Sequence, residues 1–517
     1  MHTAPRTQAS VRQVRALVCC ASLFGCACLV LLLWPGTVSA QEPADTTAGR
    51  PSAPPSYRLV RWREDWSGFR GTPGGDFWDP VKRVPIGKEE WFLSFGGRVR
   101  LITDYTPGAL DFTDAQVRQD GRRAAQQQYL AHADVHLGEH VRFFGDFLSA
   151  FYDSESTSPN GLSENRLDLH QAFADVQTGR FDDPDGQGPE EPLGLRFRFG
   201  REELAFGSWR LVGIREGPNV RIAFDGPRLT ARTGEWQFDA LLKRPIETVP
   251  GTFDDAVREG RWLGLAYATG PLPGLRGVSA DAYYIAYGSD REIYEQGTGE
   301  ERRDMVGARL WGDVPLGAGA FDFNVEGVYQ WGQFTCSEGC ASGVSDEEPI
   351  RAWTFASDLG YTFEALPLAP RLSARLNYVT GDDDPADPAL GAFNPLYPRG
   401  DYFDDNALVG PVNVYNVNPF LALSLPGEVT FTLGASFLWR ESLEDGLYGG
   451  LGKFRRPSEG SRQRFIGHQV QVIAVWQASR HFALQGIYEH FWTGDFLDDV
   501  GAPRDIDHWS LTATYTF

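Results

Sequence analysis

The chain ends in the stretch Trp509-Ser510-Leu511-Thr512-Ala513-Thr514-Tyr515-Thr516-Phe517. Apolar and hydroxyl side chains alternate through this stretch, and its last residue is aromatic. Because successive side chains of a β-strand point to opposite faces, one face is expected to meet hydrocarbon and the other water. This ending is typical of the final strand of a bacterial outer-membrane β-barrel.

Similar alternating segments recur along the chain between turn-rich gaps, and no helical periodicity of any length accompanies them. Beyond the N-terminal leader, no run approaches the roughly 18 apolar residues of a spanning helix. The sequence therefore predicts an all-β fold, a transmembrane antiparallel up-and-down β-barrel, because a closed sheet leaves no backbone N–H unpaired in lipid. About eighteen strands are expected, at 92–104, 126–137, 140–152, 165–178, 194–204, 221–232, 235–247, 261–269, 278–287, 302–312, 320–334, 351–363, 371–380, 413–424, 429–440, 464–477, 481–492 and 507–517.

The links between these strands alternate in length. Short links such as Gly138-Glu139 and Pro426-Gly427 are expected to face the periplasm, and long ones such as 381–408 and 442–463 the outside. The acidic stretch 179–193 is long although it falls on the periplasmic side. It is interpreted either as a plug that folds inward or as a floppy turn.

The N-terminus has the form of an export signal. Three arginines precede an apolar run from Ala16 to about Trp34, and Val38-Ser39-Ala40 forms a cleavage site, so residues 1–40 are predicted to be a signal peptide. A retained inner-membrane anchor and a lipoprotein site at Cys26 are the alternatives. Residues 41–90 are expected to form a Pro-rich tail and a short periplasmic segment, and residues 91–517 the barrel, in the outer membrane of a Gram-negative bacterium.

Cleavage would leave Cys336 and Cys340 as the cysteines of the mature chain. In an oxidising exterior they are predicted to form a disulfide that tightens one loop. No metal site is predicted from them, since no further Cys or His lies nearby in the sequence. His132, Asp134 and His136 share one strand face, but residues two apart on a strand lie about 6.5 to 7 Å from each other, too far for zinc without a ligand from a neighbouring strand.

The mature chain would carry 45 basic residues against 69 acidic ones, a net charge of −24, and its basic residues are almost all arginine. An arginine on the lipid face near the bilayer midplane costs about 2 to 4 kcal/mol, so arginines that alternate with apolar residues must point into the lumen. The arginines assigned inward in this way are Arg98, Arg100, Arg196, Arg198, Arg371 and Arg375. We expect them to line a polar, water-filled channel, since about eighteen strands enclose more than a packed core.

Several motifs resemble those of the alginate export family. They are Phe77-Trp78-Asp79-Pro80, the stretch from Arg201 to Gly226 that includes Arg210-Leu211-Val212-Gly213-Ile214-Arg215, Thr380-Gly381-Asp382-Asp383-Asp384, Phe393-Asn394-Pro395-Leu396-Tyr397-Pro398, and Gly467-His468. The resemblance covers residues 77–517 and implies a single-chain eighteen-stranded outer-membrane barrel, like the type member that secretes an acidic polysaccharide through an arginine-rich constriction. It also implies that Arg201, Arg215, Arg221 and Asp225 line or shape the pore.

We therefore expect a channel for passive diffusion or export of a hydrophilic, anionic solute or an alginate-like polysaccharide. A small-solute uptake porin and a barrel enzyme acting on lipid or glycan are the alternatives. The loop 381–408 is strongly acidic, with Arg399 as its one base, and an acidic mouth would repel a polyanion. The expected partners are the lipid bilayer, lipopolysaccharide, the barrel assembly machinery and periplasmic polysaccharide-secretion proteins. No cofactor, catalytic residue or nucleic-acid partner is expected.

Overall fold

The computed structural model describes residues 55–69, 71–72, 75–107, 122–154, 158–178, 193–341, 347–384, 389–400 and 402–517. The predicted signal peptide, most of the Pro-rich tail and nearly all of the acidic stretch 179–193 lie outside these residues. The predictions made for those segments therefore stay predictions.

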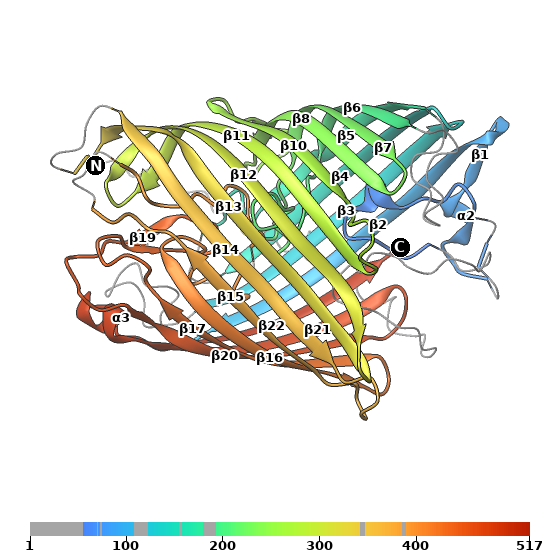
Figure 1. Cartoon of the computed structure of the whole chain (residues 1–517). Coiled ribbons are helices and arrows are strands. Elements are labelled where there is room, and N and C mark those ends of the chain that lie inside the picture. Colours follow the sequence, from blue (N-terminus) through green and yellow to red (C-terminus); the bar gives the residue numbers. More distant parts are fainter. Residues whose placement is uncertain are drawn as a thin grey trace, which may run out of the picture.

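Eighteen antiparallel strands of the described chain close into a barrel (Figure 1). Each strand pairs with the next along the sequence, and β22 pairs with β2 to close the sheet, from Arg98 opposite Thr516 to Tyr105 opposite Trp509. The strands are β2 (Lys88–Thr106), β3 (Arg122–Leu137), β4 (Val141–Ser154), β5 (Asn165–Gln177), β6 (Gly194–Glu202), β7 (Phe224–Thr233), β8 (Trp236–Glu247), β10 (Arg261–Pro271), β11 (Val278–Tyr294), β12 (Gly297–Leu316), β13 (Gly319–Glu338), β14 (Glu348–Thr362), β15 (Arg371–Val379), β16 (Val414–Leu425), β17 (Val429–Trp439), β20 (Phe465–Gln477), β21 (Phe482–Thr493) and β22 (Ile506–Thr516). The predicted barrel and its strand number are confirmed.

The strand bounds differ clearly from the predicted ones at β11, β12 and β13. These strands extend beyond the alternating apolar segments because their backbone ladders continue, as in the pairs Tyr294 with Gly297 and Thr298 with Glu338. Polar sequences such as Gly297-Thr298-Gly299-Glu300-Glu301 give no apolar alternation to recognise. Pairing with a neighbouring strand, not the residue pattern, sets where these strands end.

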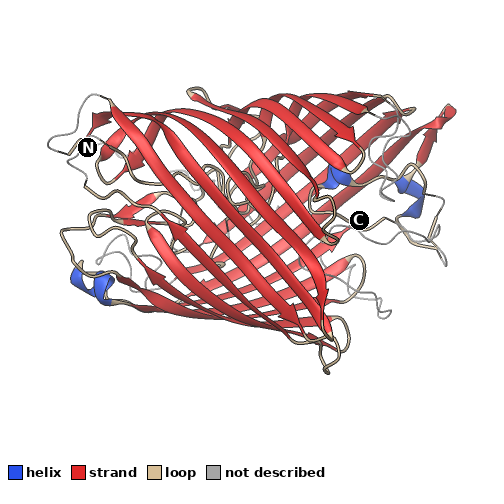
Figure 2. Cartoon of the chain, in the orientation of Figure 1, coloured by secondary structure: helices blue, strands red, loops and turns tan. Residues whose placement is uncertain are grey.

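The two ends of the barrel differ. At one end, here called the turn end, connections such as 234–235, 317–318 and 426–428 are short, and the C-terminus lies there. At the opposite end, here called the loop end, the described parts of 203–223, 380–413 and 440–464 are long (Figure 2). Short elements accompany them: β9 (Ala256–Val257), β18 (Leu447–Tyr448), β19 (Phe454–Arg456) and the helix α3 (Asp495–Asp499).

Charged and apolar side chains alternate along the strands, so that the charged ones point into the lumen and the apolar ones cover the outer face of the wall. On β2, Arg100 is 4% exposed and Leu101 is 45% exposed, and on β6 the values are 1% for Arg198 and 63% for Phe199. The exposed residues form the apolar band expected to face lipid, whereas the charged ones point inward. No helix among the described residues is long and apolar enough to cross a bilayer.

The lumen contains chain as well as wall side chains. Two inward segments, residues 203–223 and the described part of 380–413, supply buried apolar residues that pack with wall residues in one hydrophobic cluster. The backbones of Gly213 and Tyr397 join the two segments, since Gly213 N–H donates to the Tyr397 carbonyl at 2.9 Å. The expectation of a water channel without packed contents is therefore wrong for this part of the barrel.

The described residues of the segment 55–87 contact the turn end. They contain the 3-10 helix η1 (Arg61–Arg63), the helix α2 (Asp79–Lys82) and the strand β1 (Val84–Ile86), which pairs with β2. The Arg61 guanidinium donates to the carbonyls of Gly97 at 2.8 Å and Phe517 at 2.9 Å. Trp62 packs in a cluster with Phe173 and with Ala205 of the first inward segment. The described part of the predicted periplasmic segment thus enters the barrel.

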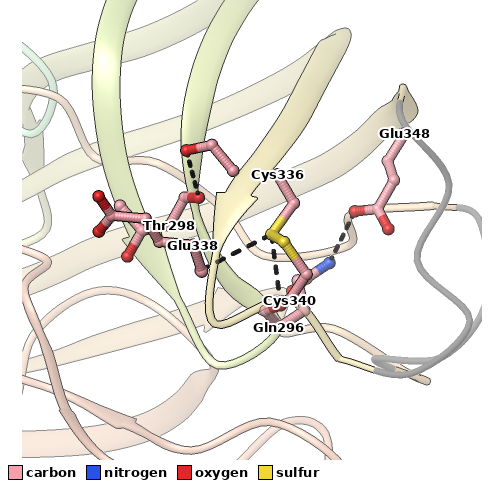
Figure 3. Close-up of a disulfide and its surroundings, with 7 residues drawn as sticks. Gln296, Thr298, Cys336, Glu338, Cys340 and Glu348 are labelled. Atoms are coloured by element: carbon pink, nitrogen blue, oxygen red, sulfur yellow. Dashed lines mark hydrogen bonds between the residues drawn. A yellow bond between two sulfur atoms is a disulfide. The ribbon is translucent and has the colours of Figure 1, made fainter.

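A disulfide joins Cys336, near the end of β13, to Cys340 at the loop end (Figure 3). The Ala341 backbone N–H beside it donates to the Gln296 carbonyl at 2.9 Å. The Gln296 side chain in turn donates to the Glu348 carboxylate at the start of β14, at 3.3 Å. The crosslink therefore lies where the β11–β12 turn, β13 and β14 meet.

Candidate functional site: the lumen and its cations

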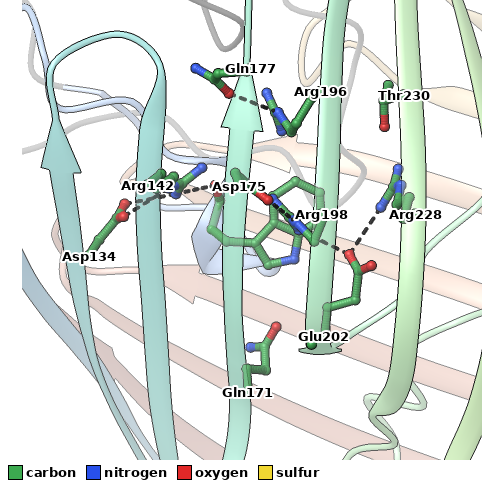
Figure 4. Close-up of polar contacts among 12 residues, drawn as sticks. Asp134, Arg142, Gln171, Asp175, Gln177, Arg196, Arg198, Glu202, Arg228 and Thr230 are labelled. Atoms are coloured by element: carbon green, nitrogen blue, oxygen red, sulfur yellow. Dashed lines mark hydrogen bonds and ion pairs between the residues drawn. The ribbon is translucent and has the colours of Figure 1, made fainter.

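One group of lumen arginines is neutralised on the wall formed by β5 to β8 (Figure 4). Arg198 contacts Asp175 at 2.7 Å and Glu202 at 2.9 Å. Glu202 also accepts from Arg228 at 3.2 Å and from Lys243 at 2.8 Å. These cations form an internal ion-pair network with little free positive charge.

A second group converges on Glu216 of the first inward segment. Arg98, Arg100 and Arg221 approach its carboxylate at 2.5, 2.9 and 2.5 Å. Burial opposes ionisation of this carboxyl, but the guanidinium charges, that of Arg221 foremost, outweigh it and hold the pKa of Glu216 well below its usual range. Arg98 and Arg100 therefore hold the inward segment against β2, whereas Arg221 pairs with Glu216 within that segment.

The remaining wall residues of the predicted set are also paired. Arg201 contacts Asp225 at 3.1 Å, Arg371 contacts Asp322 at 2.5 Å, and Arg375 contacts Asp358 at 3.0 Å. Arg196 donates to the Gln177 side chain at 3.1 Å. These side chains therefore point inward, as the alternation predicts. Each also contacts a polar partner, and the alternation gave no sign of that pairing.

Arg215 differs from the other predicted arginines. Its guanidinium lies 5.2 Å from the centre of the Tyr397 ring and donates to the Leu396 carbonyl at 3.3 Å, but no carboxylate pairs with it among the described residues. Its Nε is buried without a hydrogen-bond partner in the described part of the chain. Burial, together with the nearby charge of Arg261, lowers the pKa of Arg215 to about 10.

Two further cations, Arg258 and Lys453, lie near Arg215 and Tyr397. Arg258 follows β9, and Lys453 lies between β18 and β19; within the described chain neither side chain makes a hydrogen bond or an ion pair. Burial and the charges of Arg215, Arg455, Arg258 and Arg261 lower the pKa of Lys453. Arg261 itself is paired with Glu292 at 2.8 Å. We call Arg215, Arg258 and Lys453 the unpaired cation group.

The Tyr397 hydroxyl lies beside this group. The residue is 2% exposed, and its hydroxyl has no hydrogen-bond partner among the described residues. Arg258 and Lys453 lie in loops without periodicity, so no sequence signal marked them. Tyr397 belongs to a motif that the resemblance identified, but nothing in that motif showed the orientation of its hydroxyl.

The acidic loop 381–408 also differs from the expected mouth. Asp382 and Asp404 are buried at 1% and 3% exposure, because the loop folds into the lumen. Asp382 accepts from the Gly391 backbone N–H at 2.7 Å. Asp387 and Asp401 lie outside the described residues. The carboxylates of Asp382 and Asp404 are therefore buried within the folded loop and do not face an incoming solute.

The closed eighteen-stranded sheet, its exposed apolar band and its charged lumen define an outer-membrane β-barrel of the channel-forming class. A family model described as "Alginate export" matches residues 93–505. The chain belongs to the alginate export family. No curated protein sequence matches it.

Solved porins share the fold at low sequence identity. A BenF-like porin from Pseudomonas fluorescens Pf-5 has 9% identity and a TM-score of 0.53, with 82% of this chain and 98% of the porin covered. OccK2 (OpdF) from Pseudomonas aeruginosa, solved in complex with glucuronate, has 12% identity and a TM-score of 0.52 over the same shares. OccAB4 from Acinetobacter baumannii has 9% identity and a TM-score of 0.51, with 85% and 99% covered. Identities this low establish similarity of fold only.

Proposed function

We propose that this outer-membrane channel selects anions and moves a hydrophilic anionic solute or polysaccharide, alginate-like in carrying carboxylates. The observation that carries the proposal is the unpaired cation group beside the free Tyr397 hydroxyl. Most other lumen arginines are neutralised by neighbouring carboxylates, so their charge does not attract solute. Arg215, Arg258 and Lys453 keep a positive field where the two inward segments meet, and guanidinium and phenol groups donate hydrogen bonds to carboxylates.

The test is the reversal potential across a salt gradient in planar bilayers. Replacing Arg215 and Lys453 together with Gln keeps polar side chains but removes two charges, so selectivity should shift toward cations. The shift should be larger at about 0.01 M than at about 0.1 M salt, because the Debye length falls from about 30 to about 10 Å. Unchanged selectivity in a folded variant would remove the physical basis of the proposal.

The matched control replaces Arg302 and Lys88 with Gln. Arg302 pairs with Glu300 on the outer face, and both Arg302 and Lys88 are exposed. This variant loses the same two charge types outside the lumen. It should keep the selectivity of the parent, which separates local charge from net charge.

A small-solute uptake porin is the second candidate, and the packed lumen favours it. Leu211, Tyr397 and Phe403 are buried where a polymer would have to pass, so polymer export would need the inward segments to move. Uptake of a small carboxylate in reconstituted vesicles, without passage of an oligosaccharide, would favour the porin over the exporter.

The proposal places the channel in a Gram-negative outer membrane and assigns it no catalysis; the barrel enzyme acting on lipid or glycan is set aside. Lipopolysaccharide and the barrel assembly machinery are its proposed partners, and periplasmic polysaccharide-secretion proteins would join it if the solute is a polymer. Co-purification with each partner from membranes tests these associations.

A further inference from the structure

Three potential metal ligands from distant parts of the sequence meet at the loop end of the lumen. They are Asp104 on β2, His508 on β22 and Asp405 in the second inward segment, and one ligand atom of each lies within 4.8 Å of the others. Asp104 is 6% exposed and His508 is 3% exposed, whereas Asp405 is exposed. The group therefore joins two buried wall residues to one residue that solvent reaches.

The strand register orients the histidine. The pairing of β2 with β22 brings Thr106 beside His508, and the Thr106 hydroxyl lies 3.0 Å from Nδ1 of the ring. The opposite nitrogen, Nε2, lies 3.2 Å from a carboxylate oxygen of Asp405. In metal-binding histidines one ring nitrogen usually forms a hydrogen bond with a neighbouring group, which leaves the other nitrogen to bind the metal.

Glu489 holds the loop against this wall. It stands opposite His508 in the β21–β22 pairing, and its carboxylate accepts from the backbone N–H groups of Asp405 at 2.9 Å and Asn406 at 3.2 Å. Because Glu489 engages the loop backbone, it fixes the position of the Asp405 side chain beside His508.

An independent observation is excess buried negative charge at this place. Asp404, 3% exposed, has a carboxylate oxygen with no hydrogen-bond partner among the described residues. The Arg100 guanidinium acts electrostatically on Asp104 and Asp405, but its Nη groups are already bound to Glu216 and the Pro218 carbonyl. Buried carboxylates without a counter-charge are costly, and a divalent cation would relieve that cost.

We propose that Asp104, Asp405 and His508 bind a divalent transition metal, with zinc as the best fit. An imidazole ligand favours zinc and its neighbours over calcium and magnesium, which prefer oxygen. Ligand atoms bound tetrahedrally to zinc at about 2.0 to 2.1 Å lie about 3.3 Å apart, close to the 3.2 Å between Asp405 and His508. The metal would fasten the second inward segment to the seam between β2 and β22. This inference goes beyond the proposed function and does not depend on anion selectivity.

The experiment is zinc titration of the metal-stripped, folded barrel in detergent by isothermal calorimetry, with Co²⁺ absorption as a second probe of the ligand set. The parent should bind one equivalent at this site, and both Asp405→Asn and His508→Gln should weaken that binding at least tenfold. Heat-modifiable migration in gels checks that each variant is folded. Amide exchange should show that zinc protects residues 402–408 in the parent and not in Asp405→Asn.

The matched control is His490→Gln, which removes another His–Asp pair of the neighbouring strands. His490 lies 2.8 Å from Asp507, and its side chain alternates with the lumen-facing Glu489. This control should bind zinc as the parent does. The proposal would be overturned if the parent bound no zinc, if the two ligand variants bound as the parent does, or if His490→Gln lost binding to the same extent.

Discussion

At the scale of single residues, the lumen arginines have two roles: some pair with carboxylates inside the barrel, and others keep a positive charge that can attract a solute. Arg98, Arg100 and Arg221 are held by Glu216, whereas Arg215, its neighbour in the first inward segment, has no carboxylate partner among the described residues. Guanidinium groups suit both roles, because they pair with carboxylates in fixed geometry and remain charged when buried. Pairing, not residue type, decides which arginine supplies attraction for a solute.

The structure predicts that Glu216→Gln destabilises the barrel strongly. Three guanidinium groups would lose their common counter-charge, and breaking a buried pair typically costs about 3 to 5 kcal/mol. Urea unfolding in lipid vesicles measures this loss. Glu300→Gln, which breaks the exposed pair with Arg302, should change the free energy of unfolding by less than about 1 kcal/mol.

The effect should depend on pH with a defined sign. The pKa of Glu216 is lowered in the folded barrel from its ordinary value of 4.5, so its ion pairs stabilise the fold fully above about pH 4.5. The difference between parent and variant should shrink as the pH falls below that value. A difference that stays constant into acid would mean that the carboxylate charge is not what holds the segment.

At the scale of elements, the terminal strand is where local pattern and tertiary contact agree best. On β22 the alternation separates Leu511, 53% exposed, from the buried Ser510. The C-terminal Phe517 stacks on Trp78 with ring centres 4.0 Å apart and exchanges backbone hydrogen bonds with Gly97. Phe517 therefore helps to close the sheet and also contacts Trp78, which lies in the segment before the first barrel strand.

We expect Leu511→Arg to lower the yield of folded barrel. The charge would enter the exposed apolar band at a cost of about 2 to 4 kcal/mol near the bilayer midplane. Heat-modifiable migration of membrane fractions quantifies the folded fraction, and Leu511→Met serves as the volume-conserving control. A normal yield of the arginine variant would show that Leu511 does not face hydrocarbon.

At the scale of the whole molecule, the barrel is filled from both ends. Arg61 and Trp62 enter from the turn end, and the inward segments enter from the loop end until Trp62 and Ala205 share one cluster. A lumen wide enough for water is therefore narrowed by its own connections. Any transport path runs along these segments or requires them to move.

The topology predicts which connections reach the cell surface. A protease site inserted near Gly343, in the connection between β13 and β14, should be cut on intact cells, because long connections face outward. The same site inserted between Thr233 and Gly234, at the turn end, should be cut only after the outer membrane is opened. The opposite pattern would invert the barrel.

The sequence by itself determined the barrel, its strand number and the inward direction of the six arginines that alternate with apolar residues, because lipid outside and water inside impose a two-residue alternation on the strands. It also marked Tyr397 and Arg215 through the family motifs. Only the tertiary structure decided that the connections fill the lumen, that Glu216 neutralises three arginines, and that Lys453, Arg258, Asp405 and His508 meet their neighbours there. Loops have no periodicity, and contacts between residues hundreds of positions apart depend on the closure of the sheet, which no local pattern specifies.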